Sequence, residues 1–205
     1  MWVRPFVHDV TAVTERVFTS LGWVTAMNPF EVLGLPAVFA LDLKAVEKRH
    51  RELSRTLHPD KFVGAGASER RHALGKAVEA NEAFRVVRDP VARAEALLRL
   101  AGAAVGEGAE PTAAPEFLME VMEWREALAE ARATRDGAAV ATLAREVGGR
   151  AQASEAILAA AFVGRAPDRA QLELARIQLA ALRFYRRFLE EVAAIEEAWQ
   201  DEAAP

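Results

Sequence analysis

The sequence predicts an all-α protein made of two helical units joined by a linker. Wherever apolar residues recur periodically in the 205-residue chain, they recur at helical spacing, and alternating β-branched runs of strand type do not occur. Residues 102–115 are rich in Gly, Ala and Pro and lack apolar periodicity, so they form the expected linker. With 52% hydrophobic residues, the chain can build one medium core or two small ones.

The first unit, residues 27–101, is expected to contain an antiparallel pair of long helices. A helix over about residues 42–57 ends before Pro59, because proline disfavours helical geometry in the residue that precedes it. After a Gly-rich loop, a second long helix is expected over about residues 68–88. The inward positions are predicted to be Val46, His50, Leu53 and Leu57 in the first helix and Ala73, Ala77, Ala80, Phe84 and Val87 in the second.

Three further helices are predicted beyond the linker, where short turns favour an antiparallel three-helix bundle over residues 116–205. Before the linker, Asp89 is expected to cap a shorter helix that starts at Pro90. Gly148 and Gly149 in the middle bundle helix each cost about 1 kcal/mol relative to alanine, which predicts a kink or break there. The three bundle helices are expected over about residues 116–132, 138–163 and 168–200.

Composition excludes several classes of function. The chain has no cysteine, which rules out disulfides, thiolate metal sites and cysteine nucleophiles. Residues 27–101 carry 13 Lys and Arg against 10 Asp and Glu, whereas residues 102–205 carry 11 against 18, so the two units are expected to meet different partners. The small excess of positive charge lacks a basic stripe interleaved with aromatics, which argues against nucleic acid as a partner.

The first 26 residues form an N-terminal extension that matches no known pattern. They carry charges and are never apolar for long enough to be a signal peptide or a membrane span, so no membrane partner and a cytoplasmic location are expected. Met27 directly precedes the first recognisable motif, and it is an alternative start of translation. On that interpretation the extension has no function.

The tripeptide His58-Pro59-Asp60 is the main functional motif. It lies where the first long helix must stop, so we expect it in an exposed loop. Three residues alone match by chance, and their context makes the motif specific. The surrounding segments are Asn28-Pro-Phe-Glu-Val-Leu-Gly-Leu-Pro36, Arg49-His-Arg-Glu-Leu-Ser-Arg-Thr-Leu-His-Pro-Asp-Lys-Phe62, Asn81-Glu-Ala-Phe84 and Leu97-Leu-Arg-Leu100.

With these segments, the first unit resembles the J domain of co-chaperones. The segments Asp60-Lys61-Phe62, Asp89-Pro90-Val-Ala-Arg-Ala-Glu-Ala-Leu-Leu98 and Phe117-Leu-Met-Glu-Val-Met-Glu-Trp-Arg-Glu126 are similar to those of the HscB family, the co-chaperones of iron-sulfur cluster assembly. The resemblance covers residues 27 to about 200. It implies an N-terminal J domain that docks on a DnaK-class ATPase such as HscA, and a C-terminal bundle that holds an IscU-like scaffold.

The resemblance also implies roles for particular residues. His58 and Asp60 would switch on the ATPase of the partner chaperone, and Pro59 would shape their loop. Positive side chains nearby would meet an acidic partner surface. The candidates for this role are Lys44, Lys48, Arg49, Arg51, Arg55 and Lys61.

The first bundle helix shows two apolar stripes instead of one. At about 100° per residue, Phe117, Val121, Trp124 and Leu128 cluster on one side and form the expected core face. Leu118, Met119 and Met122 fall on the far side and need another surface to cover them, either a partner or the other domain. The HscB resemblance implies that the scaffold contacts Leu118, Met119, Met122, Glu123, Glu126, Arg183 and Phe184, although the spacing of Phe184 also fits a core residue.

The sequence gives little support for a metal site, a cofactor or an enzyme active site. His50 lies on an apolar helix face and is expected to pack there, and His8 and His72 have no companions at metal-ligand spacing, so no metal or other cofactor is expected. No nucleophile has a plausible base, which argues against an enzyme. A general J-domain protein serving other clients, and an adaptor with an inert J domain, remain as alternatives.

Overall fold

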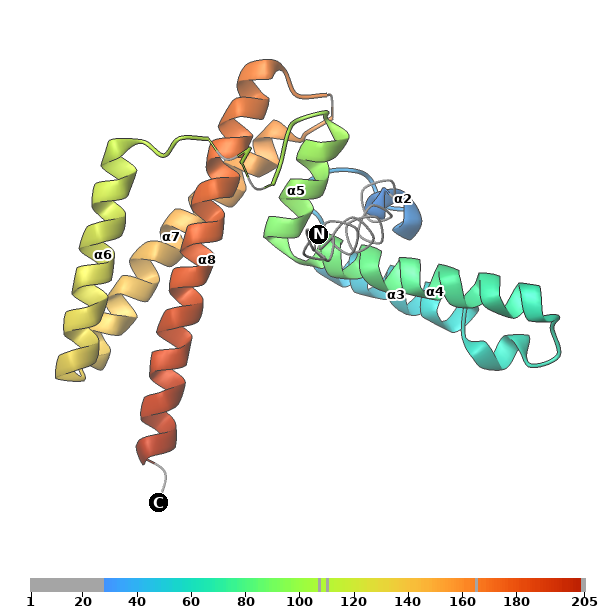
Figure 1. Ribbon diagram of the computed structural model, residues 1–205, viewed down its shortest axis with the longest axis horizontal. Helices are drawn as coiled ribbons and strands as arrows, with labels where there is room; N and C mark the ends of the chain where they lie inside the picture. The colour runs from blue at the N-terminus through green and yellow to red at the C-terminus, as the bar shows by residue number, and fades with distance from the viewer. Residues whose placement is uncertain (1–27, 107, 110, 165, 204–205) are drawn as a thin grey trace, which may run out of the picture.

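The computed structural model describes residues 28–203 except 107, 110 and 165, and this part of the chain is all-helical, without strands (Figure 1). It does not include the predicted N-terminal extension, which lies outside the described residues. None of the described helices is both long enough and apolar enough to span a membrane. The elements are α2 (Pro29–Leu33), α3 (Leu43–Thr56), the short 3-10 helix η1 (Pro59–Phe62), α4 (Ala67–Arg88), α5 (Pro90–Leu100), α6 (Pro115–Thr134), α7 (Gly137–Ala161) and α8 (Arg169–Ala203).

Side-chain caps define where the N-terminal helices begin. Asn28 Oδ1 accepts a hydrogen bond from the Phe30 backbone N–H at 3.1 Å, and Asp42 Oδ1 accepts one from the Lys44 N–H at 2.9 Å. Asp89 Oδ1 accepts from the Ala92 N–H at 2.7 Å, which confirms Asp89 as the cap of α5. The predicted helical hairpin is confirmed as α3 packed against α4.

The three bundle helices pack in an uneven way. α7 packs along α8 over much of its length, whereas the backbone of α6 runs closest to α7 and its aromatic side chains reach α8 (Figure 1). The predicted break at Gly148 and Gly149 is wrong, because α7 is continuous through both residues. Val147 and Leu158 are buried on either side of the pair, and the packing of this face outweighs the low helix propensity of glycine.

One hydrophobic core is shared by the N-terminal unit and the bundle. It contains Phe30, Leu33 and Leu98 of the first unit together with Leu158 of α7 and Leu182 of α8. A second core, around Trp124 of α6, lies wholly within the bundle. The shared core fixes the two units relative to each other, and Figure 1 shows the hairpin α3–α4 extending away from the side of the molecule on which α6 lies.

A buried arginine supports this junction. Arg93 Nη1 donates a hydrogen bond to the Val87 carbonyl at 3.1 Å, and its guanidinium carbon lies 4.7 Å from the centre of the Phe39 ring. Burial lowers the pKa of Arg93 from its ordinary value. The side chain therefore ties the end of α4 to α5 and to the segment before α3.

Candidate functional site

The motif His58-Pro59-Asp60 forms an exposed turn at the free end of the hairpin. His58 has extended backbone angles (φ −62°, ψ 133°), as expected before a proline, and Pro59 opens η1. The side chains of His58 and Asp60 are 58% and 84% exposed. The fold therefore presents both side chains to solvent, and their removal would cost the core little.

The imidazole of His58 caps this turn. Its Nδ1 accepts a hydrogen bond from the Asp60 backbone N–H at 3.3 Å, and the same atom lies 3.4 Å from Asp60 Oδ2. An ion pair with the carboxylate would need a proton on Nδ1, which would end the bond from the N–H. The hydrogen bond from the backbone N–H uses the lone pair of Nδ1, so Nε2 is the ring nitrogen that this contact leaves unoccupied.

A stripe of positive side chains leads along α3 to this turn. At about 100° per residue, Lys44, Lys48, Arg51 and Arg55 lie within roughly 60° of one another, on the side of the helix opposite buried Val46. All four are exposed, as is Lys61 in η1. Arg51 is 3.7 Å from Glu47, whereas Lys44, Lys48, Arg55 and Lys61 make no ion pair within the described part of the chain.

Arg49 differs from the other predicted cations. Its Nε donates a hydrogen bond to the Leu33 carbonyl at 2.9 Å, and its Nη1 lies 3.3 Å from Glu52 Oε2. Its guanidinium also covers Gly34, where a Cβ would lie 3.2 Å from Nη2 and where φ is +65°. Arg49 lies off the stripe and fastens α3 to the end of α2, and its predicted role in binding the chaperone stays a prediction.

His50 packs between the helices, as expected. Its ring stacks on Phe84 with centroids 4.2 Å apart, and its Nε2 is 2.8 Å from Asn81 Oδ1. These contacts join α3 to α4. They explain why a histidine is compatible with the apolar face of α3.

A second candidate surface lies on α6. Leu118, Met119 and Met122 are 50%, 63% and 70% exposed, on the side of α6 away from buried Trp124. Glu123 and Glu126 on the same helix are also exposed. Within the described residues, neither the N-terminal unit nor a neighbouring helix buries this stripe, so the possibility of internal cover is not realised.

The sequence also assigns Arg183 and Phe184 of α8 to this surface, but neither side chain belongs to the exposed stripe. Phe184 is 9% exposed, and its ring packs 5.8 Å from Phe117 and 6.2 Å from Phe188, centroid to centroid. Burial beside this cluster raises the pKa of Tyr185 above its ordinary value. Phe184 therefore fills the bundle core and lies outside the exposed stripe, and its predicted contact with the scaffold stays a prediction.

Arg183 faces the N-terminal unit. Its Nη2 donates a hydrogen bond to Glu95 Oε1 of α5 at 2.8 Å, and the two side chains are each 22% exposed. One turn later, Arg186 pairs with Asp89. The sequence analysis missed both pairs, because partners 88 and 97 positions apart leave no local pattern.

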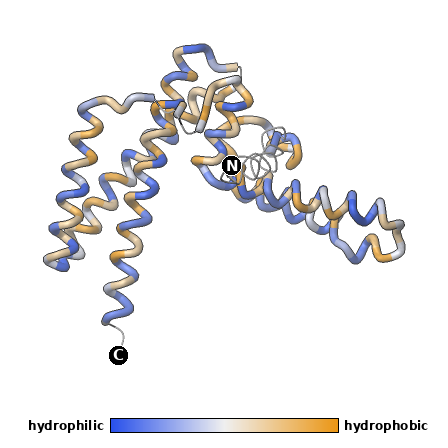
Figure 2. The backbone as a smooth tube through the Cα atoms, in the orientation of Figure 1, coloured by the Kyte–Doolittle hydropathy of each residue, from blue (hydrophilic) through white to orange (hydrophobic). Residues whose placement is uncertain are grey.

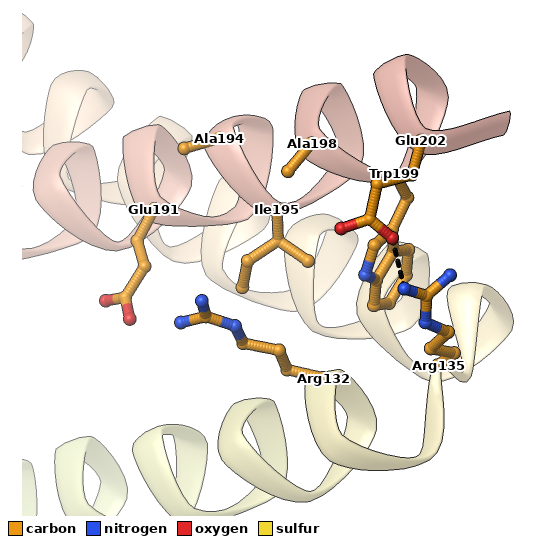
Figure 3. Close-up of a pocket in the computed structure, with 8 residues that line it drawn as sticks. All are labelled: Arg132, Arg135, Glu191, Ala194, Ile195, Ala198, Trp199 and Glu202. Carbon is orange, nitrogen blue, oxygen red and sulfur yellow. Dashed lines mark hydrogen bonds and ion pairs between the residues drawn. The ribbon is translucent and has the colours of Figure 1, made fainter. Parts of the chain in front are cut away.

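A shallow pocket of about 310 Å³ lies between α6 and α8 near the end of the bundle (Figure 3). Figure 3 shows Arg132 and Arg135 on one side and Glu191, Ile195 and Trp199 on the other, with Arg135 paired to Glu202. The pocket holds none of the predicted site residues. Among the residues that the structure describes, no cluster of His, Asp or Glu side chains fits a metal ion.

Comparisons with known proteins over most of the chain point to one family. Residues 113–193 match the family model of the HSCB C-terminal oligomerisation domain. The co-chaperone protein HscB homolog of Haemophilus influenzae is 34% identical over 171 residues, which are 83% of this chain and 95% of that protein. The homolog from Bordetella avium is 41% identical over 136 residues, 66% of this chain and 80% of that one. The solved structure of chaperone HscB from Vibrio cholerae matches with a TM-score of 0.70 and 32% identity, over 84% of this chain and 99% of that one.

Proposed function

Because this chain belongs to the HscB family of co-chaperones, we propose that it stimulates the ATPase of a DnaK-class chaperone similar to HscA and delivers an IscU-like scaffold to it during iron-sulfur cluster maturation. The observation that carries the proposal is the exposed His58-Pro59-Asp60 turn at the end of the cationic stripe of α3. Such a surface suits recognition of an acidic partner, and electrostatic complementarity would speed the encounter. The protein itself acts as a cytoplasmic binding partner and not as an enzyme.

The scaffold is proposed to bind the exposed stripe of Leu118, Met119 and Met122. Methionine side chains adapt to irregular apolar surfaces, and three large apolar groups in water favour a contact that covers them. Glu123 and Glu126 would add polar contacts at the border of the stripe. Phe184 would support this contact from the core, and Arg183 would act through the junction between the J domain and the bundle.

The shared core suggests how the two proposed binding surfaces would act together. The chaperone-binding turn and the scaffold-binding stripe belong to different units, and the packing of Leu98 with Leu158 and Leu182 holds those units in a fixed arrangement. A bound scaffold would therefore be presented at a defined position relative to the chaperone. ATP hydrolysis would coincide with scaffold capture without any flexible linker having to close.

The test uses the exposed turn. His58→Gln and Asp60→Asn are expected to leave the circular dichroism spectrum and melting temperature unchanged but to remove stimulation of single-turnover ATP hydrolysis by the chaperone. His72→Gln makes the same change at an exposed histidine of α4 and should retain full stimulation. If both turn variants stimulate as well as the parent, the proposed function is wrong.

A second measurement separates this function from that of a general J-domain protein. Adding an IscU-like scaffold should raise the stimulated hydrolysis rate further, whereas an unfolded model client should not. The opposite result would favour service to unfolded clients. A chain that binds the scaffold but never stimulates hydrolysis would be an adaptor with an inert J domain.

A further inference from the structure

The outer face of α4 carries two large apolar side chains that the core does not use. Leu74 and Val78 are 60% and 61% exposed and lie one turn apart, well away from buried Ala73 and Ala80. A scattered exposed leucine is ordinary, but adjacent apolar side chains on a surface helix form a patch. Figure 2 shows apolar positions interspersed with polar ones along the hairpin.

Hydrogen bonds locate this patch relative to α3. Asn81 of α4 and Ser54 of α3 both contact His50 Nε2, at 2.8 Å and 3.4 Å, so they mark the seam between the two helices. Val78 and Leu74 lie three and seven residues before Asn81, on the same face of α4 and nearer to η1. They therefore flank the last turns of α3, where Arg51 and Arg55 end the cationic stripe.

Positive charges outnumber negative charges around the patch. Arg55, Arg70 and Arg71 are exposed and make no ion pair within the described part of the chain. Glu82, one turn after Val78, pairs with Arg85 at 2.7 Å, and this hydrogen bond lowers the pKa of Glu82. An occupant of the patch would need apolar side chains bordered by carboxylates.

We propose that Leu74 and Val78 form an apolar anchor of the chaperone-binding surface, and that the DnaK-class chaperone covers them with an apolar spot ringed by acidic residues. This inference rests on the proposed function, because it places the anchor beside the His58-Pro59-Asp60 turn and the α3 stripe. The turn supplies the signal for hydrolysis, the stripe guides the encounter, and the anchor holds the complex. Apolar contact at the centre of a charged rim is the usual arrangement of a stable interface.

The experiment titrates the full-length protein into a purified DnaK-class chaperone and measures single-turnover ATP hydrolysis. Leu74→Gln combined with Val78→Gln keeps good helix formers on an exposed face, so circular dichroism should not change. The concentration for half-maximal stimulation should rise about tenfold, while the maximal rate at saturation is retained. Leu74→Met combined with Val78→Ile should restore the parent curve.

Matched variants separate the anchor from the proposed function. Leu174→Gln combined with Ile177→Gln makes the same chemical change at exposed positions of α8 and should leave the curve unchanged. His58→Gln should remove stimulation at every concentration. If His58→Gln behaves so but the Leu74 and Val78 variant matches the parent, the anchor is wrong and the proposed function stands; if the parent never stimulates, both are wrong. Concentration-dependent dimerisation that the variant abolishes, with an unchanged hydrolysis curve, would assign the patch to a second copy instead.

Discussion

Arg183 on α8 and Glu95 on α5 form an ion pair between the two domains, with 2.8 Å between Nη2 and Oε1. Each side chain is only 22% exposed, so solvent screens the pair less than it screens a surface pair. The neighbouring pair of Arg186 and Asp89 joins the same two helices. These residues lie at the junction that holds the J domain against the bundle.

The first prediction concerns the energetic coupling of this pair. In a double-mutant cycle of Arg183→Met and Glu95→Gln, chemical denaturation should give a coupling of about 0.5–1 kcal/mol. Scaffold affinity, measured by calorimetry, should fall no further when Arg183→Met is added to Glu95→Gln. An additional loss in that background would show that Arg183 affects scaffold binding by a route other than its pair with Glu95.

The second prediction uses the continuous course of α7. Gly148→Ala and Gly149→Ala should each raise the free energy of unfolding by about 0.5–1 kcal/mol, because both positions are helical and alanine loses less backbone entropy on folding. An added Cβ meets no atom within 4 Å at either position. Thermal denaturation checks this, and a lower melting temperature would mean that these glycines serve a different purpose.

Gly34→Ala is the matched control for the two α7 variants. Its φ of +65° is unfavourable for alanine, and its Cβ would lie 3.2 Å from Arg49 Nη2. The same substitution should therefore destabilise here, by about 1–2 kcal/mol. Opposite signs at Gly34 and at the α7 positions would tie the effect to backbone geometry.

The sequence predicts the structural features that depend on residues close together in the chain, such as helix starts and buried helix faces. Asp89 and Pro90 specify the start of α5, and the period of Val46 and His50 specifies the buried side of α3, because caps and periodicity act within a few turns. Long-range packing is different. The continuity of α7 through Gly148 and the junction role of Arg183 depend on partners far away in the chain, which no local pattern records.

In the candidate site, too, local sequence predicts which side chains are exposed, whereas long-range contacts are not predictable from it. Exposure of His58 follows from the helix ending before Pro59, and exposure of Met122 follows from its angle relative to Trp124. Arg49 carries the same charge as its neighbours, and only the Leu33 carbonyl beside it reveals its structural role. Phe184 fits both a surface and a core by spacing, and its contacts with Phe117 and Phe188 decide for the core.

The third prediction tests the charge of the α3 stripe. Arg55→Glu is expected to raise the half-maximal concentration for ATPase stimulation about tenfold at low salt, because the substitution replaces a positive charge of the stripe with a negative one. The Arg55 guanidinium makes no ion pair within the described residues that folding would lose. The difference from the parent should shrink towards 1 M salt, where the screening length is about 3 Å. Arg145→Glu makes the same charge change at an exposed position of α7 and should leave stimulation unchanged. Equal losses in both variants would point to net charge and not to the stripe.

The fourth prediction tests the scaffold-binding stripe. Combined Leu118→Ala, Met119→Ala and Met122→Ala should abolish binding of an IscU-like scaffold in calorimetry, because the variant loses the apolar contact area on that face of α6. Folding and scaffold-free ATPase stimulation should not change, since the three side chains are at least half exposed and alanine is a good helix former. Leu174→Ala combined with Ile177→Ala removes exposed apolar groups from α8 and should bind the scaffold normally. Phe184→Ala should instead lower the free energy of unfolding by about 3–5 kcal/mol, as expected for a core aromatic. A triple variant that binds as tightly as the parent, or that unfolds, would exclude this stripe as the client site.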